Sequence, residues 1–273
     1  MKSGYSCLSH KIFPIVAGLL LLLCSCSFVD PDIELPPDES AQSDVWHRNL
    51  FDVDFSLLYG GKLSELKVLY DKYASTENYV ECAFQFLEIP DTWYSPDFIY
   101  GYDLMPDSEK EKYSDMSVKG QLYPVIAVQI SPNCFDLFDI AVAQGRKFSV
   151  EDVNYFEGTT IPVLVGSNYA EYVDLGDTFS GYYLLKEFSF CVVGIMAEGS
   201  NITVNSSILK LDSYVVMPSF SCQNVPDSES EDLFQVRHYV NKLTGLYPAS
   251  ETSEIQLLNS ELEQLDIGYT EIH

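Results

Sequence analysis

The stretch ISPNCFDLFDIAVAQGRKFSVED, from Ile130 to Asp152, carries the strongest signals for local structure in this chain. It opens with a Ser-Pro-Asn turn, and Pro132 predicts the start of a short helix over 133–139, because proline is well tolerated in a first helical turn. Gly145 predicts a turn, since glycine adopts backbone angles that other residues avoid. Ser149 predicts the N-cap of a second helical turn. We therefore expect a helix, a turn and a helical turn in this order.

The side chains of this stretch predict a structural role. We expect Phe135 and Phe138 to pack the short helix against a core and Phe148 to pin the turn that follows. Arg146 is expected to be a salt-bridged turn residue. The stretch contains no nucleophile beside a base, which nucleophilic catalysis requires.

Short strands are predicted on both sides of this stretch. In 79–86, Val80, Cys82, Phe84 and Phe86 should face one side and the residues between them the other, as in a half-buried strand. The predicted strands are Tyr79–Phe86, Leu122–Ile130, Ile161–Val165, Phe188–Ile195, Ser213–Met217, Phe234–Val240 and Ile267–Ile272.

Fewer segments have helical periodicity. Leucines recur at helical spacing after Gly60 and Gly61, and the segment Glu251–Leu265 has a similar apolar stripe. Ser167 is expected to cap a helix that ends near Val173. The expected inward side chains are Leu63, Leu66, Leu69 and Tyr73 in the first helix, and Ile255, Leu258, Leu262 and Leu265 in the last. Irregular segments are predicted at 88–116, 174–180 and 226–232.

Composition limits the class of protein. The 273 residues include 47% hydrophobic and 14% aromatic residues, which is enough to form a sizeable core. The formal net charge of −26 would repel nucleic acid, so we expect no nucleic-acid partner. The seven cysteines form no C-x-x-C pair and no zinc pattern. Cys82, Cys134 and Cys191 lie in apolar surroundings and are expected to be small buried residues.

No catalytic, cofactor or metal site is predicted, and we expect the protein not to be an enzyme. The four histidines are far apart in the sequence, and no H-E-x-x-H or G-x-S-x-G pattern occurs. His238 falls in a predicted strand and is expected to be structural. Packing is also the expected role of the aromatic residues Trp93, Tyr94, Tyr100 and Tyr102, although they could form a ligand platform.

The N-terminus predicts export and attachment to a membrane. Residues 1–25 combine early lysines with a leucine-rich run, as in a secretion signal. Leu23 and Ser25 before Cys26 resemble a bacterial lipobox, which predicts lipidation of Cys26 after cleavage behind Ser25. The alternative is an uncleaved membrane helix over 12–29, at the short limit for a span. Residues 26–45 form an acidic, proline-rich linker.

Five segments between Val128 and Pro218 follow one another in an order known from one family. The first is Val128–Ile140, with the sequence VQISPNCFDLFDI, and the second is Ala141–Asp152, which contains a Gly-Arg-x-Phe turn. The other three are Ile161–Ala170, Phe188–Met196 and Tyr214–Pro218. This order resembles the MacB-type periplasmic core domain, which occurs in permeases of the FtsX/MacB family of ABC transporters. The resemblance is strongest over roughly 90 residues and weaker in the flanks.

The resemblance implies an α+β fold with two subdomains. Residues 46–273 would form the MacB-like core domain. A βαβ-like, membrane-proximal part would be built from both chain ends, and an inserted, β-rich part would cover about 131–225. Two departures stand out: Cys134 replaces a usual aromatic residue, and DLGDTFSGYYLL replaces a usual glycine-containing hairpin.

The function implied by the resemblance is non-enzymatic. The domain would be tethered to the membrane in the bacterial cell envelope, outside the cytoplasm, and would act with ABC transporter permease or ATPase subunits. The chain ends at His273, where the further membrane helices of family permeases would follow. Two alternatives stay open: a ligand-binding surface lipoprotein unrelated to transport, and a truncated permease fragment.

Overall fold

The computed structural model describes most of the chain after residue 44. The described residues are 45–52, 62–75, 79–90, 95, 98–99, 102, 105–114, 122–204, 207–224, 229–248, 252–265 and 267–272. All of them belong to one compact unit of the chain, Glu34–His273. The predicted signal segment 1–25, Cys26 and nearly all of the linker 26–45 lie outside the described residues.

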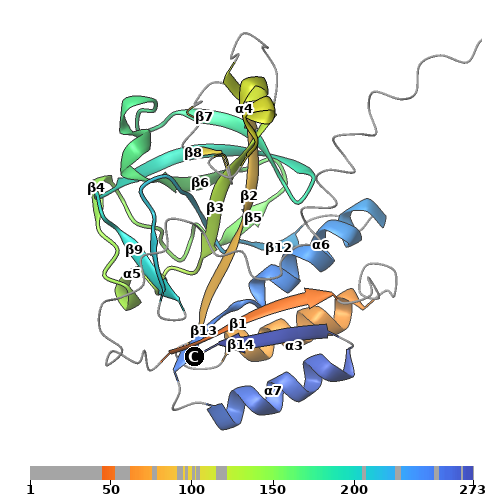
Figure 1. The fold of residues 1–273 in the computed structure, drawn as a ribbon. Helices are drawn as coiled ribbons and strands as arrows, with labels where there is room; N and C mark the ends of the chain where they lie inside the picture. Colours follow the sequence, from red (N-terminus) through yellow and green to blue (C-terminus); the bar gives the residue numbers. More distant parts are fainter. Residues whose placement is uncertain are drawn as a thin grey trace, which may run out of the picture. The chain divides into compact units, whose positions relative to one another are not determined.

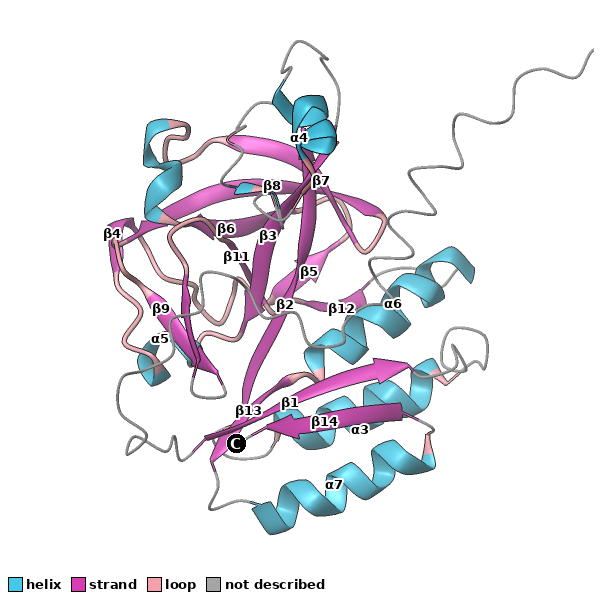
Figure 2. Ribbon diagram, in the orientation of Figure 1, coloured by secondary structure: helices cyan, strands magenta, loops and turns pink. Residues whose placement is uncertain are grey.

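The fold is α+β, as predicted, and strands are more extensive than helices (Figure 2). The strands are β1 (Val45–Asp52), β2 (Val80–Pro90), β3 (Leu122–Ile130), β4 (Val142–Gly145), β5 (Asn154–Phe156), β6 (Thr160–Val165), β7 (Thr178–Tyr183), β8 (Lys186–Met196), β9 (Asn201–Val204), β10 (Ser207–Lys210), β11 (Val215–Pro218), β12 (Ser221–Asn224), β13 (Gly245–Pro248) and β14 (Ile267–Ile272). The helices are α3 (Leu63–Ala74), α4 (Asp107–Ser114), α5 (Cys134–Leu137), α6 (Glu229–Lys242) and α7 (Thr252–Gln264), with a 3₁₀-helix, η4 (Ser167–Glu171).

Ten strands form one mixed sheet in the order β14-β1-β13-β2-β3-β11-β6-β8-β4, and β7 pairs with β2 and β8. The longest pairing is the antiparallel one between β2 and β3, from Cys82 opposite Ile130 to Pro90 opposite Leu122. The first two residues of β2 also pair with β13, so that β2 connects the two ends of the sheet (Figure 1). Two small sheets, β9 with β10 and β5 with β12, lie outside this path.

Helices α3, α6 and α7 pack together at one end of the sheet, beside β1, β13 and β14 (Figure 1). We call this part the helical end. Its core contains Leu66, Leu69 and Tyr73 of α3, as the leucine spacing predicted, together with Leu262 of α7 and Ile267 of β14. Because α3 and α7 contribute one apolar stripe each, burial of that stripe holds these two helices in place.

The other end of the sheet, which we call the strand-rich end, is buried on both faces. Along β3, Val125 and Ala127 belong to one hydrophobic core, whereas Val128 and Ile130 belong to a second one on the opposite face. The same alternation occurs along β6 and β11. Strands that are covered on both faces have nearly continuous apolar sequences, which explains the apolar runs in these segments.

The stretch from Ile130 to Asp152 folds largely as predicted. The short helix is α5, shorter than predicted, and its Phe135 is buried with its ring 5.6 Å from that of Phe148. Gly145 has a φ of 82°, and a Cβ at this position would lie 2.2 Å from the Val193 carbonyl oxygen. Glycine is therefore required there for both backbone conformation and space.

Arg146 is a salt-bridged turn residue, as predicted. Its Nη2 lies 3.0 Å from Asp152 Oδ1, and Asp152 Oδ2 accepts the backbone N–H of Ser149 at 2.7 Å. Burial acts to raise the pKa of Asp152, but these contacts outweigh it and the pKa is lowered. The predicted N-cap at Ser149 is wrong. An N-cap hydroxyl accepts a hydrogen bond from the helix backbone, whereas the Ser149 hydroxyl donates to Asp152. Residues 150–153 form turns and no helix.

The predicted strand Phe234–Val240 is wrong, because these residues lie in helix α6. Phe234 contributes to the core of the strand-rich end, and Val236 and Tyr239 contribute to that of the helical end. Because α6 is buried on two sides, its apolar residues do not form the single stripe that indicates a helix. Their spacing resembles the alternation that indicates a strand, which explains the wrong prediction. The segment 226–232, predicted as a loop, includes the first residues of this helix.

Three smaller predictions also need correction. Ser167 does not cap a helix: η4 is preceded by Gly166, and the Ser167 hydroxyl donates to Asp212 at 2.7 Å. The predicted turn 174–180 includes the start of β7. In β2, Val80 and Cys82 are buried as predicted, but Glu81, expected on the other face, is buried too, and Phe84 is 40% exposed.

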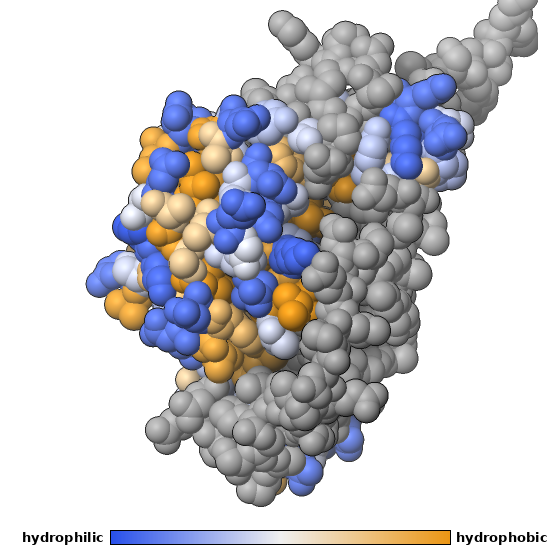
Figure 3. Space-filling view, turned by 60° about the vertical axis from the view of Figure 1, so that its left-hand side comes forward, coloured by the Kyte–Doolittle hydropathy of each residue, from blue (hydrophilic) through white to orange (hydrophobic). Residues whose placement is uncertain are grey.

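On the face shown in Figure 3, hydrophobic and hydrophilic residues are interspersed over the described surface. Among the described residues, no helix is long and apolar enough to span a membrane. Nor do the described histidines, cysteines and acidic residues gather into a group that could hold a metal ion.

Candidate functional site

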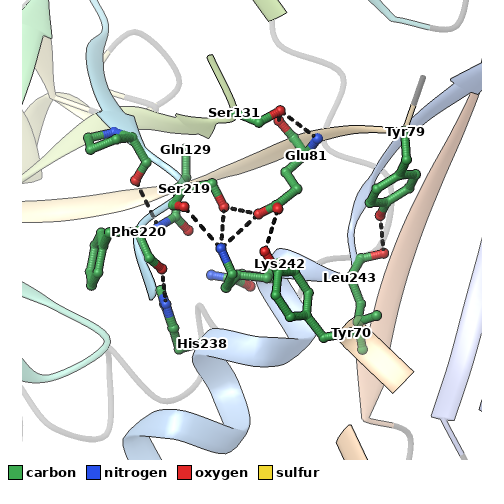
Figure 4. Close-up of polar contacts among 12 residues, drawn as sticks. Tyr70, Tyr79, Glu81, Gln129, Ser131, Ser219, Phe220, His238, Lys242 and Leu243 are labelled. Atoms are coloured by element: carbon green, nitrogen blue, oxygen red, sulfur yellow. Dashed lines mark hydrogen bonds and ion pairs between the residues drawn. The ribbon is translucent and has the colours of Figure 1, made fainter. Parts of the chain in front are cut away.

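A buried polar cluster lies where β2 passes from the helical end to the strand-rich end of the sheet (Figure 4). It consists of Tyr70 on α3, Glu81 on β2, Ser219 after β11 and Lys242 at the end of α6, and we call it the polar junction. Two regions of the chain thus meet through side-chain hydrogen bonds, and Glu81 and Lys242, which link them, are 161 residues apart.

Lys242 is the centre of the polar junction. Its side chain is 1% exposed, and its Nζ donates to Glu81 Oε2 at 2.9 Å, to Ser219 Oγ at 2.9 Å and to the Ser219 carbonyl oxygen at 3.0 Å. These three bonds use all three hydrogens of an ammonium group. A buried ammonium is stable only when it is paired and fully hydrogen-bonded, and this geometry meets that requirement.

Glu81 supplies the opposite charge. Its Oε2 accepts hydrogen bonds from Lys242 and from the hydroxyl of Ser219, and its Oε1 accepts the hydroxyl of Tyr70 at 2.7 Å. Burial, followed by the nearby Glu81 carboxylate, raises the pKa of Tyr70, so its phenol remains a donor. Both carboxylate oxygens of Glu81 are therefore hydrogen-bonded within the protein.

A serine beside a lysine raises the question of catalysis, because a neutral lysine can act as the base for a serine nucleophile. The geometry of the polar junction opposes this role. Lys242 Nζ donates to Ser219 Oγ, to the Ser219 carbonyl oxygen and to Glu81 Oε2, so it is not placed to accept the serine proton. Ser219 is only 4% exposed and donates its proton to Glu81. The arrangement is suited to joining elements and not to attacking a substrate.

His238 of α6 forms a second buried cluster with Tyr183, Gln129 and the backbone of Phe220. Its Nε2 lies 2.8 Å from the Phe220 carbonyl oxygen, which can only accept, so Nε2 carries the hydrogen. Its Nδ1 lies 3.1 Å from the Tyr183 hydroxyl, whose single hydrogen also faces Gln129 Oε1 at 3.2 Å. Burial, with the charges of Lys242 and Lys186, lowers the pKa of His238 to about 3, so the ring is neutral.

Arg48 of β1 centres a third cluster, at the helical end. Its side chain is fully buried, and its guanidinium lies 3.9 Å from the centre of the Tyr73 ring. Within the described residues it donates to Asn259 Oδ1 at 2.9 Å, to the Tyr79 hydroxyl at 3.1 Å and to the Leu243 carbonyl oxygen at 2.7 Å. Burial raises the pKa of Tyr79 to about 12, although the charge of Arg48 opposes this.

These clusters were not predicted from the sequence. Glu81 was expected on the outer face of a half-buried strand, and Arg48 and Ser219 carried no local signal. His238 was expected to be structural, and the structure gives it a buried, fully hydrogen-bonded ring, although on a helix. A charged residue inside an apolar helical face, such as Lys242 after Tyr239, was the one signal that could have been followed.

Of the other residues considered for a site, only Tyr102 is described. Cys26, Trp93, Tyr94 and Tyr100 lie outside the described residues. Tyr102 is half-buried, with Lys110 Nζ 5.6 Å from the centre of its ring.

Comparisons with known proteins give likenesses in structure only. No protein-family model matches the sequence, and no curated protein gives a significant match. The periplasmic region of MacB from Actinobacillus actinomycetemcomitans is 11% identical, with a TM-score of 0.41, and the match covers 85% of this chain and 92% of that one. The extracellular domain of the noncanonic ABC-type transporter YknZ from Gram-positive bacteria is 10% identical, with a TM-score of 0.40, covering 84% of this chain and all of that one (100%). Both are domains of the kind that the motifs between Val128 and Pro218 resemble.

Proposed function

We propose that this chain is a non-enzymatic extracytoplasmic domain that is tethered to the membrane and acts with an ABC transporter complex. The observation that carries the proposal is the ordered set of five segments between Val128 and Pro218, each of which falls on a regular element or a tight turn of the fold. Fold likeness alone does not define a function, so the proposal rests on these residues and on their arrangement.

The finer architecture belongs to the same proposal. The helical end would be the membrane-proximal subdomain, since both chain ends contribute to it through β1, α7 and β14. The strand-rich end would contain the inserted subdomain, at about 131–225. Among the described elements, β2 and α6 contribute to both ends, and the polar junction lies where they meet.

A relay of motion would use this crossing. Interfaces that switch between two arrangements move as rigid parts about a few linking residues. The polar junction fixes one arrangement by directional hydrogen bonds, which lose their geometry when the parts shift. Lys242 and Glu81 would then hold the resting arrangement, and a partner that binds another arrangement more tightly would shift the population.

The experiment that tests the partner is crosslinking in intact cells, followed by purification of the tagged full chain and identification of the proteins attached to it. We expect ABC transporter permease or ATPase subunits to be enriched over an unrelated envelope protein that carries the same tag. Absence of any transporter subunit after crosslinking would contradict the proposal and favour a ligand-binding surface lipoprotein.

A further inference from the structure

Two of the described cysteines lie together in one core. Cys82 on β2 and Cys134 at the start of α5 are both 0% exposed and belong to the same hydrophobic cluster. Both are free thiols in this structure. Interaction with the Cys82 thiol, together with burial, raises the pKa of Cys134 well above its usual value.

The backbone holds these two positions together. The Ser131 N–H donates to the Glu81 carbonyl oxygen at 3.0 Å, and the Glu81 N–H donates to Ser131 Oγ at 2.9 Å. Asn133 Nδ2 donates to the Tyr79 carbonyl oxygen at 3.1 Å. Glu81, just before Cys82, is thus bonded to Ser131, and Asn133, just before Cys134, is bonded to Tyr79, which keeps α5 against β2.

We propose that Cys82 and Cys134 form an intramolecular disulfide that joins α5 to β2. The bond would close the base of the β2–β3 hairpin, since Cys82 pairs with Ile130 in the sheet. Its formation in the cell rests on the proposed location outside the cytoplasm, where disulfides persist. The proximity of the two thiols does not depend on that location.

The chemistry is thiol–disulfide exchange with a disulfide-bearing oxidant, either a protein oxidoreductase or oxidised glutathione. One thiolate attacks the oxidant and forms a mixed disulfide, and the second thiol then displaces the oxidant's sulfur. In sum, the two cysteines lose two protons and two electrons, and the oxidant's disulfide becomes two thiols. Both sulfurs are buried, so the exchange takes place before α5 closes on β2 or when it opens.

Differential alkylation of the full chain tests the pair. Protein isolated from cells is denatured and treated with iodoacetamide, then reduced and treated with N-ethylmaleimide, and the label on each cysteine is identified by peptide mass. We expect the second label on Cys82 and Cys134 and the first label on Cys191, which lies on β8 and serves as an internal control. In Cys82→Ser the label on Cys134 should change to the first one.

A second arm separates this proposal from the proposed location. The purified chain is fully reduced and unfolded, and is then refolded in the presence of oxidised glutathione. Formation of the Cys82–Cys134 disulfide supports the pair, and if the same cysteines are reduced in cells, the extracytoplasmic location fails while the pair stands. Should both cysteines stay reduced, or carry glutathione without joining, the proposed disulfide is overturned. The wild-type chain alone gives this answer even if the serine variant does not fold.

Discussion

His238 shows how burial converts a titratable residue into a structural one. A histidine in an unfolded chain has a pKa near 6.5, whereas that of buried His238 is lowered to about 3. Between these values the unfolded chain binds a proton that the folded protein does not. The free energy of unfolding must therefore fall as the pH is lowered through this window, and the loss is absent above about pH 6.5.

We expect His238→Gln to remove this loss, because an amide can still donate to the Phe220 carbonyl oxygen but does not titrate. Between about pH 7 and about pH 5, the wild-type protein should lose about 2 kcal/mol more unfolding free energy than the variant. Urea unfolding at several pH values measures the difference. Parallel pH profiles for the two proteins would contradict a neutral buried His238.

Removal of one partner of the Lys242–Glu81 ion pair is expected to lower the free energy of unfolding strongly. Lys242→Met keeps the alkyl chain but leaves the Glu81 carboxylate largely buried without its cation, and we expect a loss of about 3–5 kcal/mol. Adding Glu81→Gln should cost less than the sum of the two single changes, since the charge left behind is removed. Urea unfolding of the wild-type protein, the two single variants and the double variant measures the coupling energy between the two residues.

The matched control is the ion pair of Lys72 and Glu261, whose side chains are 44% and 35% exposed. Lys72→Met should change stability by less than about 1 kcal/mol, because water screens an exposed pair. If Lys242→Met and Lys72→Met lower the free energy of unfolding equally, burial does not determine how much the polar junction contributes to stability.

At the scale of elements, Gly145 and Gly158 have similar positive φ angles but different surroundings. Gly145 has a φ of 82° and Gly158 one of 78°, but a Cβ would contact the Val193 carbonyl oxygen only at Gly145, and nothing within 4 Å at Gly158. We expect Gly158→Ala to cost about 1 kcal/mol, for the conformation alone. Gly145→Ala should cost clearly more, because β4 must also move from β8. Equal thermal shifts would show that space at Gly145 is not limiting.

Helix α7 allows a similar comparison between two leucines. Leu262 is fully buried against the helical end, whereas Leu257 is 66% exposed. We expect Leu262→Ala to lower the free energy of unfolding by about 2–5 kcal/mol and Leu257→Ala to change it by less than about 0.5 kcal/mol. Chemical denaturation distinguishes them, and a large effect at Leu257 would mean that another surface covers this side of α7 in solution.

At the scale of the whole molecule, the proposed attachment to the membrane would depend on Cys26. We expect wild-type protein from cells to begin at Cys26 and to carry acyl chains, which anchor it because each buried methylene contributes about 0.8 kcal/mol. Cys26→Ser should be neither acylated nor processed normally. Cys24→Ser, two positions earlier, should leave both processes intact. Intact-protein mass measures this, and Met1 retained without lipid would favour a membrane helix.

Local sequence determined the elements whose environment is simple. Helix α3, strand β3 and strand β14 have nearly the bounds that their periodicity or apolar runs predicted, and the turn at Gly145 followed from one residue. Each of these needs only one apolar stripe, an unbroken apolar run or a special backbone angle, and such features can be recognised from neighbouring residues. The α+β class followed from the same elements.

The tertiary structure alone decided what lies between the two ends of the sheet. Helix α6 is buried on two sides, so its sequence has no single stripe, and both faces of β2 are covered near Glu81 and Cys82, so alternation fails there. Glu81 and Lys242 are 161 residues apart in the chain, and His238 and Tyr183 are 55 apart. A buried charge or ring is stable only beside its partners, and these partners are brought together by the folding of the whole chain.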